Sequence, residues 1–192
     1  QAAMRTGVAQ KPIEDMDAYR HTLKARLNPT TSVLTRVYDE ARANPKRVVF
    51  AEAEDEVTLR AAIQFRDQGY GTPVLVGRDA TVRDMLVELG VDDPDSYEIH
   101  NSTTSPLVDS MVDRLYERLQ RRGYLRRDVQ RMVNRDRNVF GALMLSLGQA
   151  DAMITGRTRT FNQSLREVRR VLDSKPDYDA FGIHLLVGKN HT

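Results

Sequence analysis

Apolar residues follow two alternating patterns along this chain, short continuous runs and longer stretches with helical spacing. The first run, residues 47–52, predicts a buried strand, and residues 55–68 carry apolar side chains at the spacing of one helix face. Gly69 provides the stop for that helix, and residues 73–76 repeat the buried-strand pattern. A strand that alternates with a helix in this way predicts parallel strand pairing.

The alternation continues through the rest of the chain. A helix is expected from Thr81 to Gly90, a third strand over residues 97–100, and a long helix from Ser105-Pro106 to Gly123. The remaining expected elements are helices over 126–133 and 139–147, a strand over 152–154 and a final helix through Val171. The fold class predicted is α/β, with three αβα layers around a mainly parallel, doubly wound sheet, in which ligands bind beyond the carboxyl ends of the strands.

Both ends of the sequence suggest that it belongs to a longer protein. Residues 12–27 predict a helix, which a joint over residues 28–31 separates from a second helix over residues 32–42. Residues 181–187 predict an apolar strand close to the end, and such a strand needs another segment or a partner to cover it. Because the chain also starts at Gln1, we expect it to be a piece of a protein that continues beyond Thr192.

Composition narrows the class of protein. The chain has 192 residues, 40% of them hydrophobic and 29% charged, which is typical of a soluble globular domain. Its 29 basic and 27 acidic residues leave a net charge of only +2, which does not indicate a nucleic-acid partner. The absence of cysteine excludes disulfides and thiolate chemistry. No apolar run approaches the ~20 residues of a membrane span, so we expect a cytoplasmic protein with no membrane partner.

Several familiar catalytic motifs are missing. The sequence has no glycine-rich dinucleotide fingerprint, no P-loop and no serine-hydrolase nucleophile elbow. Its four histidines are scattered, and none pairs with another at the spacing of metal ligands, so no metal site is predicted. Nucleotide binding through the usual loops and acyl-enzyme chemistry on serine are therefore not supported.

One strand-to-helix turn has the makeup of an anion site. After the strand predicted at 152–154, Gly156 frees the turn, and Thr160 with Gln163 forms a capping box that opens the last helix. Free backbone N–H groups and the positive end of the helix dipole would point where Arg157 and Arg159 also reach, an arrangement that suits phosphate or pyrophosphate. The alternative is that both arginines are simply solvated.

Two clusters of charged residues can be explained either by a functional site or by ordinary helix-end and surface effects. Four acidic residues, Glu52, Glu54, Asp55 and Glu56, crowd the turn after the first strand, where sites occur but where acidic groups also favour a helix amino terminus. Nine arginines lie between positions 114 and 137, interleaved with acidic residues. A solvated surface or a subunit contact explains the arginine run better than a charged cofactor or nucleic acid.

Longer segments resemble the phosphate acetyltransferase family. The resemblance is carried by VVFAEAEDEVTLRAAI, TPVLVGR and ADAMITGRTRTFNQSLREV, at residues 48–63, 72–78 and 150–168. Together with RRGYLRRDVQRMVNRDRNVFGALML, at 121–145, they are similar to the carboxy-terminal acetyltransferase-like domain of large bacterial hybrid malic enzymes. The resemblance implies that residues 31–192 form the amino-terminal part of that domain, truncated before its second subdomain is complete, and that residues 1–30 are a linker and helix from the malic enzyme domain.

The family motif is altered at the anion turn. Phosphate acetyltransferases usually read G-A-x-H-x-T-A-D-x-x-R there, whereas this chain has Arg159 in place of the histidine and Gln163 in place of the aspartate. Arg166 keeps the family arginine, and Ala53 stands where a glycine is common. The resemblance places further catalytic residues beyond Thr192, so it implies no catalytic residue in this sequence.

Similarity to the malic enzymes implies a regulatory role. The domain would bind acetyl-CoA or CoA through Gly156, Arg157, Arg159, Thr160 and Arg166, and inhibit the NADP-dependent oxidative decarboxylation of malate to pyruvate. NADP and a divalent metal would act only in the malic enzyme domain, the rest of that chain would be a partner, and a homo-oligomer is expected. The helix over residues 12–27 is a candidate lever. An active phosphate acetyltransferase and a purely structural oligomerisation module remain the alternatives.

Overall fold

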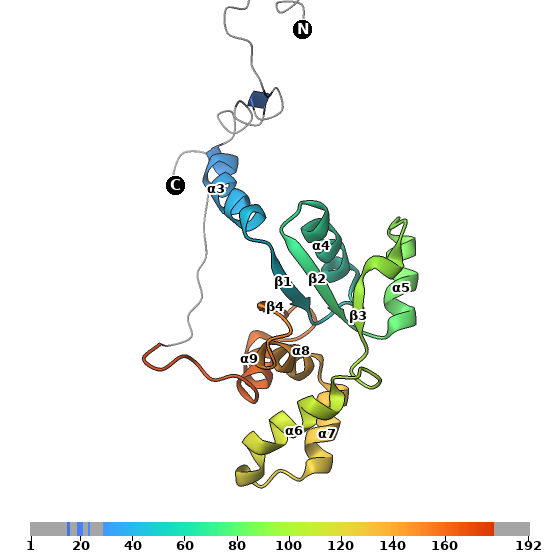
Figure 1. Ribbon diagram of the computed structural model, residues 1–192, viewed down its shortest axis with the longest axis vertical. Helices are drawn as coiled ribbons and strands as arrows, with labels where there is room; N and C mark the ends of the chain where they lie inside the picture. The colour runs from blue at the N-terminus through green and yellow to red at the C-terminus, as the bar shows by residue number, and fades with distance from the viewer. Residues whose placement is uncertain (1–14, 16–18, 21–22, 24–28, 179–192) are drawn as a thin grey trace, which may run out of the picture. The chain divides into compact units, whose positions relative to one another are not determined.

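The computed structural model describes residues 15, 19, 20, 23 and 29–178 (Figure 1). Most of the helix expected over residues 12–27, and all of the strand expected over 181–187, lie outside the described residues. Helix α3 (Pro29–Ala43) confirms the second helix but starts earlier than predicted. The prediction that residues 28–31 form a joint between helices is therefore wrong for residues 29–31, which belong to α3. The fixed φ angle of proline suits the first turn of a helix.

Within residues 29–178 the sheet has four parallel strands, as the alternating pattern predicts. They are β1 (Lys46–Phe50), β2 (Gly71–Val76), β3 (Glu98–His100) and β4 (Ala152–Ile154), in the order β3-β2-β1-β4. Val49 pairs with Val74 of β2 on one side and with Met153 of β4 on the other. The continuous apolar runs of β1 and β2 reflect burial on both faces of the sheet, as expected of central parallel strands.

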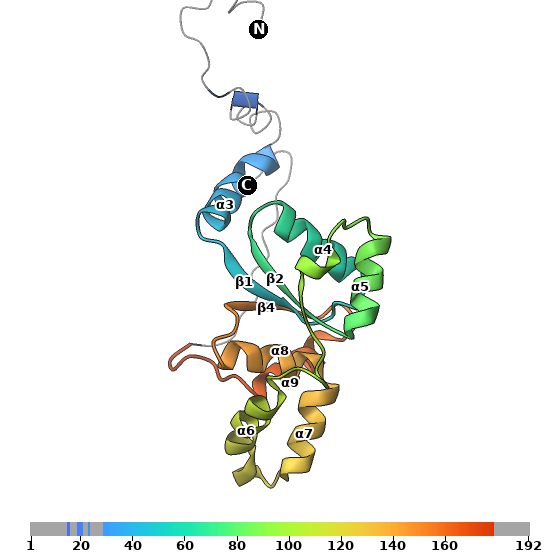
Figure 2. The same cartoon turned by 45° about the vertical axis from the view of Figure 1, so that its right-hand side comes forward.

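Helices cover both faces of this sheet (Figures 1 and 2). α4 (Glu56–Asp67) and α5 (Asp79–Glu88) lie on one face, and α8 (Arg137–Ser146) lies on the other. α6 (Val108–Leu119), α7 (Arg126–Arg135) and α9 (Phe161–Arg169) pack against α8, and there are two short 3-10 turns, η1 (Pro94–Ser96) and η2 (Gln120–Arg122). Phe50 packs in one core with Leu59 of α4, whereas Val49 packs in a second core with Phe140 of α8. Alternate residues of β1 thus serve opposite layers, which confirms the three-layer αβα class.

Gly141 allows α8 to lie close against the sheet. A Cβ atom at this position would come within 2.5 Å of Met153 Sδ and 3.2 Å of Val49 Cγ1. A larger residue would push α8 away from β1 and β4, or displace Met153. This close approach fixes the start of α8 beside the loop that follows β4.

Two features are absent from the described residues. None of the helices there is both long and apolar enough to cross a membrane. Within the same residues, no three side chains of His, Asp or Glu gather as ligands of a metal ion.

Candidate functional site

Glu52 occupies the turn that we expected to hold phosphate. This side chain follows β1, is only 4% exposed, and reaches the loop after β4. Its carboxylate accepts hydrogen bonds from the Arg157 N–H (2.7 Å), the Thr158 N–H (3.2 Å) and the Thr158 hydroxyl (2.5 Å). The premise that the N–H groups of this turn are free for an anion is therefore wrong at these two positions.

Thr160 caps α9 as predicted. Its hydroxyl accepts a hydrogen bond from the Gln163 backbone N–H at 3.4 Å. The Gln163 side chain, expected to complete the capping box, donates to Glu167 Oε1 at 3.1 Å, one turn further along the helix. The helix start is thus confirmed, whereas the second half of the expected box is replaced by a contact within α9.

Arg159 lies in an ion-pair network with two carboxylates. Its Nη1 is 3.1 Å from Asp136 Oδ1, which belongs to the residue that caps α8, and 2.6 Å from Glu167 Oε2. Glu167 is 6% exposed and also accepts a hydrogen bond from Asn138 Nδ2 at 2.7 Å. That Arg159 binds the ligand stays a prediction, and the structure shows that its Nη1 is already engaged by two carboxylates.

The pKa values of the two carboxylates in this network are shifted in opposite directions. Burial raises the pKa of Asp136, and repulsion from Glu167 adds to the rise. Burial would also raise the pKa of Glu167, but hydrogen bonds from Arg159, Asn138 and Gln163 outweigh it and lower that pKa. Glu167 is therefore the carboxylate that depends most on Arg159.

Arg157 is the more accessible of the two arginines. Its side chain is 57% exposed, and its Nε lies 3.8 Å from Asp55 Oδ2, at the long limit of an ion pair. Asp55 also caps α4 by accepting the Thr58 N–H at 3.0 Å. This cap confirms the helix-terminus interpretation for one member of the acidic turn.

Glu54 holds three segments together, a role that the sequence did not reveal. Its carboxylate accepts the Arg78 N–H at 2.7 Å and lies 2.6 Å from Arg137 Nη2 at the start of α8. Burial alone would raise the pKa of Glu54, but hydrogen bonds from the Arg78 side chain and backbone and from Arg137 outweigh it and lower the pKa to about 2. These partners lie far away in the sequence, so no local pattern could identify them.

Replacing Glu54 with glutamine is expected to lower the free energy of unfolding at pH 7 by about 2 kcal/mol, discounted because the exposed Arg78 is screened by water. Because the folded-state pKa lies below 4.5, the stabilisation is present above pH 4.5 and is lost as the pH falls toward 2. Urea unfolding of both proteins across this range should show their stabilities converging at low pH. Glu56→Gln, at an exposed pair with Arg60, is the control, and an equal loss there would contradict the prediction.

Arg166 belongs to a cluster of arginines on the outer side of α9. Four arginines, Arg122, Arg166, Arg169 and Arg170, line a cavity of about 480 Å³ together with Asn162 and Leu165. Within the part of the chain that the structure describes, none of these four forms an ion pair with a carboxylate. We call them the basic cluster, and they leave guanidinium groups available to an anion in a way that Arg159 does not.

An apolar groove adjoins the basic cluster along α9. It has a volume of about 410 Å³ and is lined by Met153, Gly156, Phe161, Leu165 and Val168, among others. Gly156 has a φ of 101°, a left-handed conformation that favours glycine, and Phe161 is 75% exposed. Because Leu165 lines both the groove and the arginine-lined cavity, the two form adjacent parts of one surface.

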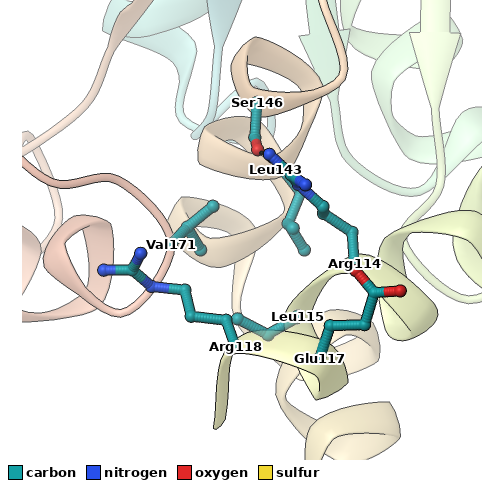
Figure 3. Close-up of a pocket in the computed structure, with 7 residues that line it drawn as sticks. All are labelled: Arg114, Leu115, Glu117, Arg118, Leu143, Ser146 and Val171. Atoms are coloured by element: carbon teal, nitrogen blue, oxygen red, sulfur yellow. Dashed lines mark hydrogen bonds between the residues drawn. The ribbon is translucent and has the colours of Figure 1, made fainter.

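A third cavity, of about 320 Å³, lies between α6, α8 and the residues after α9 (Figure 3). Arg118 lines it, but its Nε donates to the Arg170 carbonyl at 2.9 Å and its Nη1 to Asp173 at 2.6 Å. Arg114 reaches the Ser146 hydroxyl at 3.3 Å. The Arg118 contacts fasten the residues after α9 to α6, and the Arg114 contact links α6 to α8, so at least two arginines of the long basic run have structural roles.

Comparison with known proteins gives consistent results for sequence and fold. The family model for phosphate acetyl/butaryl transferases matches residues 32–192. An NADP-dependent malic enzyme of Rhizobium meliloti (strain 1021) is 45% identical over 192 residues, covering 100% of this chain and 25% of that protein. A probable NADP-dependent malic enzyme of Rickettsia prowazekii (strain Madrid E) is 35% identical, covering 99% of this chain and 25% of that protein. The chain thus spans about a quarter of these relatives.

Among solved structures, a phosphotransacetylase from Streptococcus pyogenes superposes with a TM-score of 0.70 at 26% sequence identity. The superposition covers 78% of this chain and 45% of that one. The layers around the sheet are therefore shared with an acetyl-transferring enzyme, whereas the similarity over the full chain is to proteins named as malic enzymes.

Proposed function

This chain belongs to the phosphate acetyl/butaryl transferase family, and from that premise we propose that it is the acetyl-CoA-sensing regulatory domain of an NADP-dependent malic enzyme. In this proposal the domain does not transfer acetyl groups. The oxidative decarboxylation of malate to pyruvate, with its NADP and divalent metal, belongs to the rest of the full-length protein. Similarity along the whole chain to two proteins named as NADP-dependent malic enzymes supports this assignment.

The main observation behind the proposed loss of acetyl transfer is the environment of Arg159. Arg159 stands where the family motif has a histidine, and Gln163 where it has an aspartate. A guanidinium remains protonated at any physiological pH and a glutamine side chain does not titrate, so neither can act as a general base. Asp136 and Glu167 also hold Arg159 in place through its Nη1, where a base would have to be free to move a proton.

Acetyl-CoA has a polyanionic end and a long neutral arm, and the outer surface of α9 offers a region for each. The basic cluster supplies several guanidinium groups that suit phosphates, and the adjoining groove supplies apolar surface. Among the predicted site residues, Gly156 lines the groove and Arg166 belongs to the basic cluster. We therefore move the proposed phosphate contacts from the turn at 156–160 to the basic cluster.

The proposal is tested on the full-length protein by two measurements. Calorimetry should show acetyl-CoA binding, and malate-dependent reduction of NADP should be inhibited at the same acetyl-CoA concentrations. Inhibition requires that acetyl-CoA bind one arrangement of the domains better than another, because equal affinity would shift nothing. An assay for acetyl phosphate from acetyl-CoA and phosphate should give no product.

Two results would replace the proposal with its alternatives. Sustained formation of acetyl phosphate would identify an active phosphate acetyltransferase. A protein that ignores acetyl-CoA, yet dissociates into smaller species when this domain is deleted, would identify a structural oligomerisation module.

A further inference from the structure

The hydroxyl of Ser164 is buried in the apolar groove without a partner. Ser164 lies on α9, is 5% exposed, and its Oγ forms no hydrogen bond within the described part of the protein. It is the one buried side-chain polar atom in that part of the chain with this property. Buried hydroxyl groups are nearly always hydrogen-bonded, because an unpaired one has lost its water without compensation. Ser164 therefore marks a place where a ligand atom can supply the missing partner.

The surroundings of Ser164 define the kind of group that fits. Every side chain that lines the groove is uncharged, and Met153, Phe161 and Val168 present apolar atoms. A Cβ on Gly156 would lie 4.0 Å from Ser164 Oγ, in ordinary van der Waals contact, so Gly156 lies directly beside the hydroxyl. A neutral, largely apolar chain that carries an isolated hydrogen-bond acceptor matches this lining, whereas a carboxylate or phosphate does not.

We propose that the Ser164 hydroxyl donates a hydrogen bond to an amide carbonyl of the pantetheine arm of CoA. The pantetheine arm is a neutral chain with two amide groups, and the basic cluster beyond Leu165 lies where the phosphates at its other end would be held. This inference rests on the proposed binding of acetyl-CoA and adds to it a residue that determines how the arm is recognised. Ser164 positions the ligand and takes no part in the chemistry of the malic enzyme reaction.

Pantetheine tests this inference without the phosphates, because it cannot use the basic cluster. In the full-length protein, Ser164→Ala is expected to weaken pantetheine binding about five- to tenfold, the effect of one neutral hydrogen bond. The melting temperature of the ligand-free variant should stay the same or rise, because the substitution removes an unpaired buried hydroxyl. A residue with a merely structural role would not combine weaker binding with unchanged or greater stability.

Two further variants complete the experiment. Ser164→Thr keeps a hydroxyl and should restore most of the affinity for pantetheine. Ser110→Ala, at an exposed serine of α6, should change neither the affinity nor the melting temperature. If Ser164→Ala lowers the melting temperature and leaves the affinity unchanged, another part of the protein satisfies the hydroxyl and the inference is overturned. In that case acetyl-CoA would still bind the wild-type protein, whereas failure of the proposed function would abolish that binding as well.

Discussion

Replacing both Arg166 and Arg169 with glutamine in the full-length protein is expected to weaken acetyl-CoA binding about 100-fold. Each charge-assisted hydrogen bond from an arginine to a phosphate contributes ~1.5 to 3 kcal/mol, and loss of two at the lower value corresponds to about that factor. Both side chains belong to the basic cluster and have no carboxylate partner among the described residues, so their loss leaves no buried charge unpaired. Calorimetry measures the affinity, and the acetyl-CoA concentration that half-inhibits malate oxidation should rise by the same factor.

The matched control is Arg127→Gln with Arg135→Gln. These two exposed arginines of α7 lie outside the groove and the arginine-lined cavity, and their replacement changes the net charge by the same amount. An equal loss of affinity in the control would mean that acetyl-CoA responds only to overall charge, an effect that added salt would largely screen. Unchanged affinity in the Arg166 and Arg169 variant would place the phosphates elsewhere.

Replacing Arg159 with alanine is expected to lower the free energy of unfolding by about 3 kcal/mol, because breaking a largely buried ion pair leaves the remaining charge uncompensated. The side chains of Glu167 and Asp136 are only 8% and 15% exposed and would lose a shared cation. Glu167 would be affected most, because Arg159 is the main group that lowers its pKa against the effect of burial. Equilibrium urea unfolding measures the change.

Arg157→Ala is the control for this variant, since it removes the same side chain two positions away in the same loop. Arg157 is more than half exposed and only 3.8 Å from Asp55, so its loss should cost less than about 1 kcal/mol. If both variants lose the same stability, the network around Arg159 does not carry the effect that we assign to it. Weak ligand binding by Arg159→Ala would have to be corrected for the fraction of unfolded protein.

The local pattern of the sequence was sufficient for most of the fold. Continuous apolar runs located β1 and β2, and helical spacing located α4 and α6, because burial on two faces or on one stripe leaves a periodic signal in the chain. The cap at Thr160 was predicted on the same basis, since a cap involves residues only three positions apart. For the turn after β4, the sequence predicted the backbone but not that Glu52 accepts its N–H groups.

What the sequence determined by itself is the αβα architecture, its family and the replacement of two motif residues, because these are written in local periodicity and in the order of residues. Only the tertiary structure decided which of the polar and charged groups pair with one another. Glu52 meets the Arg157 N–H across 105 positions of sequence, and Arg159 meets Asp136 across 23. Parallel strands bring their carboxyl ends to one edge of the sheet, so carboxylates from distant turns reach the same donors there, and no spacing along the chain records which donor each one takes.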